Sequence, residues 1–315
     1  MYPVLFSIGS LSISSFGLFL TLGFLMAAFI VWRLARIYDL NEEKMLDLAI
    51  LVFLGGLLGA RIYFVITHWG LFEDVGKAIL INRYPGLSFW GGFAGGIIAL
   101  KIFAERNKLN FWQVADFAAV GFILGLAFGD LGCFLGGCGY GVVSNSPLAI
   151  GVVGLVGKRF PVSLLEGFIF ILAFVYLWRQ AVKFHFAGKI ASLSLLILGI
   201  VKFSLEYFRG DKGPPLPFVP GFFYHQLWAV LFLTLGIVIF YYRSKRKFLA
   251  DMLAIVVLFG SSKKREILLL KARRNWYNYR VRWKIGSGKA MAFLRSLPKA
   301  ARKKLNVKPT PTKLG

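Results

Sequence analysis

The chain is poor in charged residues. Only 17% of its 315 residues are Asp, Glu, Lys or Arg. A soluble protein of this length carries charge on about a quarter of its residues, so this shortage argues against a soluble two-domain protein. The mean hydropathy is +0.68. Several apolar runs reach the length of about 20 residues that a bilayer-spanning helix needs, and we therefore expect a membrane protein.

Cysteine is also scarce, and the chain begins without a basic segment. The two cysteines, Cys133 and Cys138, exclude a disulfide-rich scaffold. We expect both to be small packing residues, and we expect no metal and no cofactor. No basic residue precedes the first apolar stretch. The sequence therefore predicts no cleavable signal peptide, and the first helix is expected to remain in the mature protein.

Acidic residues are the third shortage, since 14 Asp and Glu stand against 38 Lys and Arg and leave a net charge of +24. From Arg243 onward there are 21 basic and two acidic residues, so this segment carries +19 and residues 1–242 carry +5. The bilayer core rejects unpaired charge. The chain is therefore predicted to be a nearly balanced membrane domain, 1–242, followed by a basic cytoplasmic tail, 243–315.

The expected fold is an all-α, polytopic integral membrane protein with seven transmembrane helices. The Lys and Arg residues of the short loops favour an N-terminus outside and a C-terminus inside, and the basic tail strengthens this orientation. A multi-pass protein of the cytoplasmic (inner) membrane follows. The seven apolar segments are 15–32, 46–66, 87–104, 114–135, 161–178, 189–208 and 222–242.

Charged residues within these segments are the first candidates for a site, because a charge inside a membrane is costly. Lys202, Glu206 and Arg209 are spaced i, i+4, i+7 and are expected to share one helix face. Cations near the outer leaflet suit an anionic headgroup, so a lipid-modifying enzyme and a small transporter both fit. Asp116 is nearer the inner end and is expected to cap or pair there. The remaining candidates are Arg61, Asp130 and Glu166.

Glycine is clustered in two ways. Spacings such as those of Gly91 and Gly95, or Gly121 and Gly125, favour close packing between helices. The run 129–141 holds six glycines in thirteen residues. Because glycine is a poor helix former, this run is expected to break the helix and to form a wall of a site.

Several short motifs follow one another along residues 1–242. Some combine glycine with a charged residue, as at 59–63 and 129–141, and one has the form Lys-Phe-x-x-Glu-x-x-Arg. In chain order they are SSFGL at 14–18, GARIY at 59–63, SFWGG at 88–92, Asp116, GDLGCFLGGCGYG at 129–141, PVSLLE at 161–166, KFSLEYFR at 202–209 and Gln226.

As a set, these motifs resemble those of the prolipoprotein diacylglyceryl transferase family. The resemblance implies transfer of a diacylglyceryl group from phosphatidylglycerol to the lipobox cysteine thiol of a prolipoprotein. We expect Asp130 and Glu206 to be the catalytic residues, although Asp130 departs from the family pattern as described below. The resemblance also implies substrate binding by Arg61, Lys202, Arg209, Glu166, Trp90, Gly91, Gly92, Gly132 and Gly141.

The chain departs from the family pattern at several of these positions. Trp90 stands where the family has His, Asp130 where it has Arg, and Lys202 where it has another Arg. Either Asp130 acts as the base in place of the lost histidine, or it pairs with Lys202 or Arg61 and cancels the phosphate site. A non-catalytic relative that binds lipid or a lipoprotein precursor is the alternative function.

The basic tail lies beyond the motifs. Residues 263–285 interleave cations with Trp276, Tyr277, Tyr279 and Trp283, which favours an interface with anionic lipids. Contact with nucleic acid and a solvated extension without a partner are the weaker interpretations.

Overall fold

The structure is a computed structural model that describes residues 4–8, 11–72, 74, 76, 86–152, 154–212, 215–216, 221–245 and 248. The chain divides into two units, Met1–Arg246 and Lys247–Gly315. The fold described below belongs to the first unit. Apart from 243–245 and 248, the tail predicted at 243–315 lies outside the described residues.

Long helices make up most of the described chain. Each of the seven predicted apolar segments overlaps one of them. The α-helices are α1 (Ser15–Ile37), α2 (Glu42–Thr67), α4 (Phe89–Arg106), α5 (Phe111–Gly136), α6 (Val162–Ala181), α7 (Lys189–Leu205) and α8 (Tyr224–Ser244), and the 3₁₀ helices are η1 (Trp69–Leu71) and η2 (Glu206–Phe208).

Three of the helices begin at a side chain that accepts a hydrogen bond from the first turn. The Ser14 hydroxyl accepts from the Gly17 amide at 3.1 Å, and the Asn41 side chain accepts from the Lys44 amide at 2.9 Å. Asn110 accepts from the Trp112 amide at 3.0 Å. These caps satisfy amide groups that have no partner within the helix, which fixes where α1, α2 and α5 begin.

Two short hairpins correct the all-α prediction. β1 (Val4–Ile8) pairs antiparallel with β2 (Leu11–Ser14), and β3 (Ile150–Gly151) pairs antiparallel with β4 (Lys158–Arg159). Both hairpins lie outside the long helices, where the backbone must find hydrogen-bond partners by other means.

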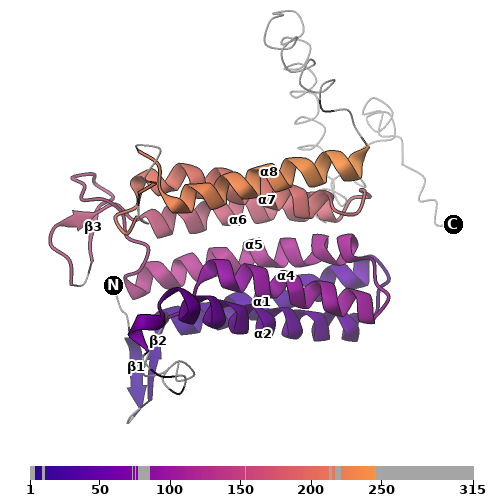
Figure 1. The fold of residues 1–315 in the computed structure, drawn as a ribbon, viewed down its shortest axis with the longest axis horizontal. Coiled ribbons are helices and arrows are strands. Elements are labelled where there is room, and N and C mark those ends of the chain that lie inside the picture. The colour runs from indigo at the N-terminus through magenta and orange to yellow at the C-terminus, as the bar shows by residue number, and fades with distance from the viewer. Residues whose placement is uncertain are drawn as a thin grey trace, which may run out of the picture. The chain divides into compact units, whose positions relative to one another are not determined.

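The helices pack around α5, as Figure 1 shows. On one side α1 packs against α5 and α2 against α4; on the other, α6 and α7 contact α5, and α8 packs on α7. Glycine permits the closest contact, because a Cβ on Gly91 would collide with the carbonyl oxygen of Gly59 across the α2–α4 interface. The prediction of close packing at these glycines is confirmed.

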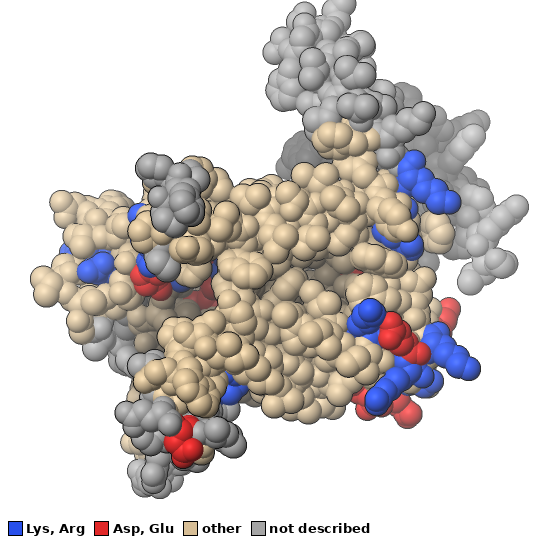
Figure 2. Space-filling model, in the orientation of Figure 1, with Lys and Arg blue, Asp and Glu red and all other residues tan. Residues whose placement is uncertain are grey.

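The outer surface of the bundle is apolar. Leu58 is 65% exposed, Ile66 69% and Val238 62%. Figure 2 shows few charged side chains along the middle of the viewed face, with most of them gathered toward the two ends of the helices. Among the described residues, six helices are long and apolar enough to cross a membrane: α1, α2, α5, α6, α8 and α7 together with η2. The chain is therefore a polytopic membrane protein, because such a surface is unfavourable in water.

The glycine-rich run is helical over most of its length, so the prediction of a broken helix at 129–141 is wrong. α5 continues to Gly136 and ends at Gly137, whose φ of 86° is left-handed. A Cβ on Gly132 would approach the Cβ of Phe19 to 2.8 Å, so glycine here allows α1 to pack closely. In an apolar environment the helical hydrogen bonds are obligatory, which outweighs the low helix propensity of glycine.

Candidate active site

A buried carboxylate on α6 holds two cations from α7 and the segment after it. Glu166 is 2% exposed. Its Oε1 lies 2.5 Å from Nζ of Lys202, and its Oε2 lies 3.8 Å from Nη1 of Arg209. The side chains of Lys202 and Arg209 are each 21% exposed, so both cations reach the surface of the cluster while Glu166 lies beneath them.

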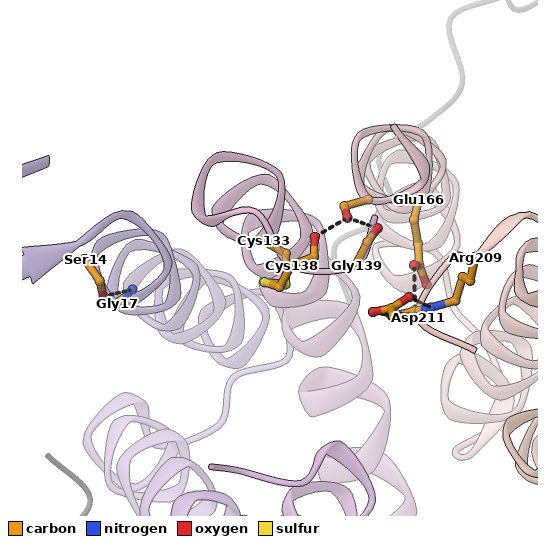
Figure 3. Close-up of a disulfide and its surroundings, with 9 residues drawn as sticks. Ser14, Gly17, Cys133, Cys138, Gly139, Glu166, Arg209 and Asp211 are labelled. Atoms are coloured by element: carbon orange, nitrogen blue, oxygen red, sulfur yellow. Dashed lines mark hydrogen bonds and ion pairs between the residues drawn. A yellow bond between two sulfur atoms is a disulfide. The ribbon is translucent and has the colours of Figure 1, made fainter. Parts of the chain in front are cut away.

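Arg209 is fixed by a second acid and by the backbone. Its Nε and Nη2 donate to the two carboxylate oxygens of Asp211 at 3.1 and 3.2 Å, as Figure 3 shows beside Glu166. Arg209 follows η2 in extended conformation and forms a bridge with Gly141. The expected single helix face for Lys202, Glu206 and Arg209 is therefore wrong in detail, because α7 ends at Leu205. Lys202 and Arg209 nevertheless meet at Glu166.

Asp130 lies beside this cluster, close to the end of α5. Its charge interacts with those of Glu166, Lys202 and Arg209. Its Oδ2 is buried and accepts no hydrogen bond from the part of the chain that is described. Lys202 forms its ion pair with Glu166 rather than with Asp130. One interpretation of Asp130 expected an ion pair with Lys202 or Arg61. The described residues do not show the pair with Lys202.

A histidine that was not among the predicted site residues completes the cluster. Nδ1 of His225, in the first turn of α8, lies 3.1 Å from Oε1 of Glu206. The Glu206 side chain is 4% exposed and that of His225 is 41% exposed. The one signal in the sequence was the position of His225, directly before Gln226 of the last motif. Spacing alone does not reveal that α8 brings it to Glu206.

The segment after α5 is fastened beside the ion pairs. Cys133 and Cys138 form a disulfide with an S–S distance of 2.12 Å, which corrects the prediction of two free packing cysteines. The left-handed turn at Gly137 brings the two residues together. The Ser163 hydroxyl donates to the carbonyl oxygens of Cys138 and Gly139 at 3.0 and 2.6 Å. Figure 3 shows Cys138 and Gly139 beside the disulfide.

This segment is then tied to the chain around Arg209. The Val142 amide donates to the carbonyl oxygen of Phe208 at 3.0 Å, and the Gly210 amide donates to that of Tyr140 at 2.8 Å. A Cβ on Gly141 would collide with the carbonyl oxygen of Phe160. Residues 140–142 thus contact the chain around Arg209. That the run 129–141 forms a wall of the site stays a prediction.

Arg61 and Trp90 lie on the α2–α4 side. Nη1 of Arg61 donates to the carbonyl oxygen of Gly86 at 3.0 Å, and its guanidinium lies 5.1 Å from the ring centre of Phe72. Trp90 stacks on Trp228 of α8, with ring centres 4.8 Å apart. Trp228 lies one helical turn after His225. The position that resembles the family's histidine thus touches the helix that carries His225.

The predicted glycines are explained by close contacts, and their part in substrate binding stays a prediction. Gly91 and Gly132 lie in the tight interfaces described above. A Cβ on Gly92 would lie 3.4 Å from the carbonyl oxygen of Gly56, which is a tight contact.

Asp116 lies at the opposite end of the helices, where α5 and α7 begin. Its two carboxylate oxygens accept from the amides of Gly188 and Ala191, both at 2.8 Å. Nε2 of His185 lies 3.3 Å from Oδ2 of Asp116. The Tyr38 hydroxyl lies 3.2 Å from Nδ1 of His185. The prediction that Asp116 caps or pairs at this end is confirmed.

The surroundings of Asp116 raise the pKa values of His185 and Tyr38. Burial lowers the pKa of His185, but its hydrogen bonds to Asp116 and to the Lys183 carbonyl raise it more, and the net pKa is raised. The pKa of Tyr38 is also raised, first by burial and then by the charge of Asp116. Across the described residues, no group of three or more His, Cys, Asp or Glu side chains is arranged to hold a metal ion.

The sequence model of the family described as prolipoprotein diacylglyceryl transferase matches residues 3–263. The chain belongs to this family. Three similar relatives are all named phosphatidylglycerol–prolipoprotein diacylglyceryl transferase. The one from Photobacterium profundum is 34% identical over 217 residues, 66% of this chain and 80% of the relative. The one from Chlorobaculum tepidum is 32% identical over 277 residues, which cover 80% of this chain and 93% of the relative. The one from Finegoldia magna is 30% identical over 213 residues, which cover 67% of this chain and 85% of the relative.

Membership of the diacylglyceryl transferase family confirms the resemblance inferred from the motifs. The matched region contains every predicted site residue and also His225. It ends inside the basic tail, so residues 264–315 lie outside this match.

Proposed function

We propose that this protein transfers the diacylglyceryl group of phosphatidylglycerol to the lipobox cysteine thiol of prolipoproteins. The thiol sulfur forms a thioether with the glyceryl carbon, and glycerol phosphate leaves. The names of the relatives support this reaction. The observation that carries it within this chain is the pair of cations, Lys202 and Arg209, held by buried Glu166 at one end of an apolar helix bundle.

We place this cluster toward the outer face of the cytoplasmic membrane. α4 is counted as the seventh span, since its 18 residues reach the lower length limit and its charges, Lys101, Glu105 and Arg106, lie at one end. With the N-terminus outside, the starts of α6 and α8 face outward and the basic residues that follow α8 face inward. Phosphatidylglycerol in the outer leaflet then meets the cluster directly.

Lys202 and Arg209 are assigned to the phosphate. When the bond between the glyceryl carbon and the phosphate oxygen breaks, the phosphate gains a negative charge, and preformed cations favour that change. Glu166 contacts both cations and keeps them at fixed positions before the lipid arrives. Arg209 offers a planar set of donors, whereas Lys202 acts as a point charge.

Asp130 acts against phosphate binding in this arrangement. Four carboxylates, those of Asp130, Glu166, Glu206 and Asp211, surround two cations. A further anion in the form of a lipid phosphate is repelled by each of them, and within the described residues Asp130 forms no direct ion pair with either cation. A catalytic role for Asp130 stays a prediction, and its removal tests both roles.

Arg61, Trp90 and the glycines are assigned to the remainder of the lipid. Trp90 and Trp228 present stacked aromatic surface between α4 and α8, which suits the glyceryl and acyl portions of the lipid. Backbone groups near Gly92, Gly132 and Gly141 are candidates for contact with the substrate, and Gly91 supports Trp90 from the next position.

We assign the basic tail to the inner leaflet. Its cations alternate with aromatic residues, a pattern that suits attraction to anionic lipid headgroups. Vesicles that contain phosphatidylglycerol should retain the full chain more strongly at low salt than a chain that ends at residue 245. Equal retention would leave the tail without a membrane role.

The reaction is tested with purified protein in phosphatidylglycerol vesicles and a lipobox peptide. Mass spectrometry should show a peptide heavier by one diacylglyceryl group, and a peptide with Ser in place of the lipobox Cys should stay unmodified. If the folded protein yields no product, the proposed reaction is wrong. Retention of phosphatidylglycerol without product would identify a lipid-binding relative without catalysis.

A further inference from the structure

His225 and Glu206 form a pair with the geometry of an oriented base. The distance of 3.1 Å from Nδ1 of His225 to Oε1 of Glu206 is that of a hydrogen bond. An ionised carboxylate only accepts hydrogen bonds, so Nδ1 carries the proton and donates it. Nε2 then holds a lone pair. Because the Glu206 side chain is 4% exposed and that of His225 is 41% exposed, the acid is fixed inside and the imidazole faces outward.

The other two histidines of the chain are engaged elsewhere. His68 stacks on Phe64 at the end of α2, with ring centres 4.5 Å apart. His185 is enclosed at the opposite end of the helices, and its side chain is 5% exposed. His225 is therefore the one histidine of this chain at the ion-pair cluster. It reaches the cluster from α8, one turn from the Trp228 ring on which Trp90 stacks.

We propose that His225 is the general base that removes the proton from the acceptor thiol, with Glu206 as its positioning residue. This inference rests on the proposed function. The S–H proton passes to Nε2 of His225. The thiolate sulfur forms a bond with the glyceryl carbon, and the bond from that carbon to the phosphate oxygen breaks, with its electron pair remaining on the phosphate. Glycerol phosphate leaves beside Lys202 and Arg209, and the imidazolium then loses its proton to water.

Two physical reasons favour His225 over Asp130 for this step. A base must contact the thiol and then return its proton to solvent, which a half-exposed imidazole does directly and a carboxylate with a buried oxygen does not. The thiolate is the reacting form of cysteine, and a histidine held by an acid is a common means of producing it. Arg209 lies next to the pair, since its Nε is 4.0 Å from Oε2 of Glu206. The departing phosphate and the base therefore share one region.

The test is the initial rate of peptide lipidation between pH 5 and 9 in phosphatidylglycerol vesicles, for the full chain and matched variants. His225→Gln should lower the rate about 10²–10⁴-fold and lose the rise in rate with pH that a histidine base gives. Imidazole in the buffer should restore part of the rate to His225→Ala. Glu206→Gln should retain more activity than His225→Gln and change the pH profile of the rate, because the imidazole keeps its place but loses the ionised partner that orients it.

His68→Gln is the matched control and should stay within about twofold of the wild type, since His68 lies outside the cluster. Unfolding midpoints of all variants establish that they fold. If His225→Gln does not fold, the wild-type pH profile and the imidazole rescue of His225→Ala decide the matter.

The outcomes separate the two proposals. Wild-type protein without activity overturns the proposed function, and this inference with it. An active wild type whose His225→Gln variant keeps its rate and pH profile overturns this inference alone. In that case a large loss of activity in Asp130→Asn would assign the base to Asp130.

Discussion

The two ends of the helix bundle each contain a buried carboxylate and a histidine, but their partners differ. The two carboxylate oxygens of Asp116 accept hydrogen bonds from the amides of Gly188 and Ala191. His185, which contacts Asp116, is buried. Glu166 instead pairs with two cations that are each 21% exposed, and His225 nearby is 41% exposed. The contacts of Asp116 involve buried groups and stabilise the start of α7. The contacts of Glu166 leave two cations partly exposed, close to the exposed imidazole of His225.

This difference separates a structural buried charge from a functional one. Both are costly to bury. At the Asp116 end the cost is offset by hydrogen bonds to the backbone of the start of α7, so the gain is stability. At the Glu166 end we propose that the cations remain able to bind a further anion, so that the gain is binding and catalysis. The predictions below test this division, from the largest expected effect to the smallest.

Lys202→Met should remove most of the transfer activity. A cation beside the developing phosphate charge is worth about 10²–10³-fold in rate, and Met keeps the length of the side chain without its charge. Lys202→Arg should retain activity, because it keeps the charge and adds a planar set of donors. The measurement is the lipidation rate per folded molecule. Equal rates for Met and Arg would show that the charge at this position is not used.

Asp116→Ala should lower stability while the activity of the folded fraction is kept. Removing the acceptor leaves two amides and His185 without their partner, which costs about 2–4 kcal/mol. Asp116→Asn keeps one acceptor oxygen and should lose roughly half as much. Denaturant unfolding in detergent gives the stability. A selective loss of lipidation in a fully folded Asp116→Ala protein would contradict the structural role.

Replacing both Cys133 and Cys138 by Ser should destabilise the protein by about 2 kcal/mol, as expected when a disulfide that closes a short loop is removed. Activity should fall less than for Lys202→Met, because Ser163 and the amides of Val142 and Gly210 still hold the segment. The comparison of oxidised, reduced and double-Ser protein in one unfolding series checks this. An undiminished midpoint after reduction would show that the disulfide adds no stability.

Asp130→Asn should raise the affinity for phosphatidylglycerol about tenfold. One negative charge several ångströms from the phosphate is worth on the order of 1–3 kcal/mol at an effective dielectric constant of about 20. Asp130→Arg should raise it further. Both follow from equilibrium binding of the lipid in a neutral detergent. Weaker binding by Asp130→Asn would mean that Asp130 helps to hold the lipid.

The pH dependence of stability at the Asp116 end should be small and should come from His185. Its pKa is raised on folding, so the contribution of the protonated form is fully present below the unfolded value of about 6.5 and is lost as pH rises through the folded value. The unfolding midpoint should fall across this window by on the order of a few °C. His185→Gln should lose this trend, and an unchanged trend would assign it to another group.

The sequence predicted the membrane class, the positions of the apolar segments and the cost of the intramembrane charges. Those predictions rest on hydropathy and spacing, which are local. The position of Asp116 was predicted correctly because it lies near the start of the apolar segment 114–135, and hence near a helix end. Lys202 and Arg209 were brought together correctly, although the helix ends before Arg209.

What the sequence did not predict depends on contacts between distant segments. The pairing of Glu206 with His225 needs α7 and α8 packed side by side. The disulfide needs the left-handed turn at Gly137, and the helical run to Gly136 needs the packing of α1 against Gly132. Glycine content alone overstated the break in this helix, because propensity is a weak term beside tertiary packing.

The most direct test of this account is a side-by-side measurement on Arg209→Gln and Asp116→Ala. Lipidation rate per folded molecule and unfolding midpoint are measured for both, relative to the wild type. We predict that Arg209→Gln loses at least about 10²-fold in rate and keeps more of its stability than Asp116→Ala, which keeps its rate and loses stability. Two variants that lose rate and stability in the same proportion would contradict the division between the two ends.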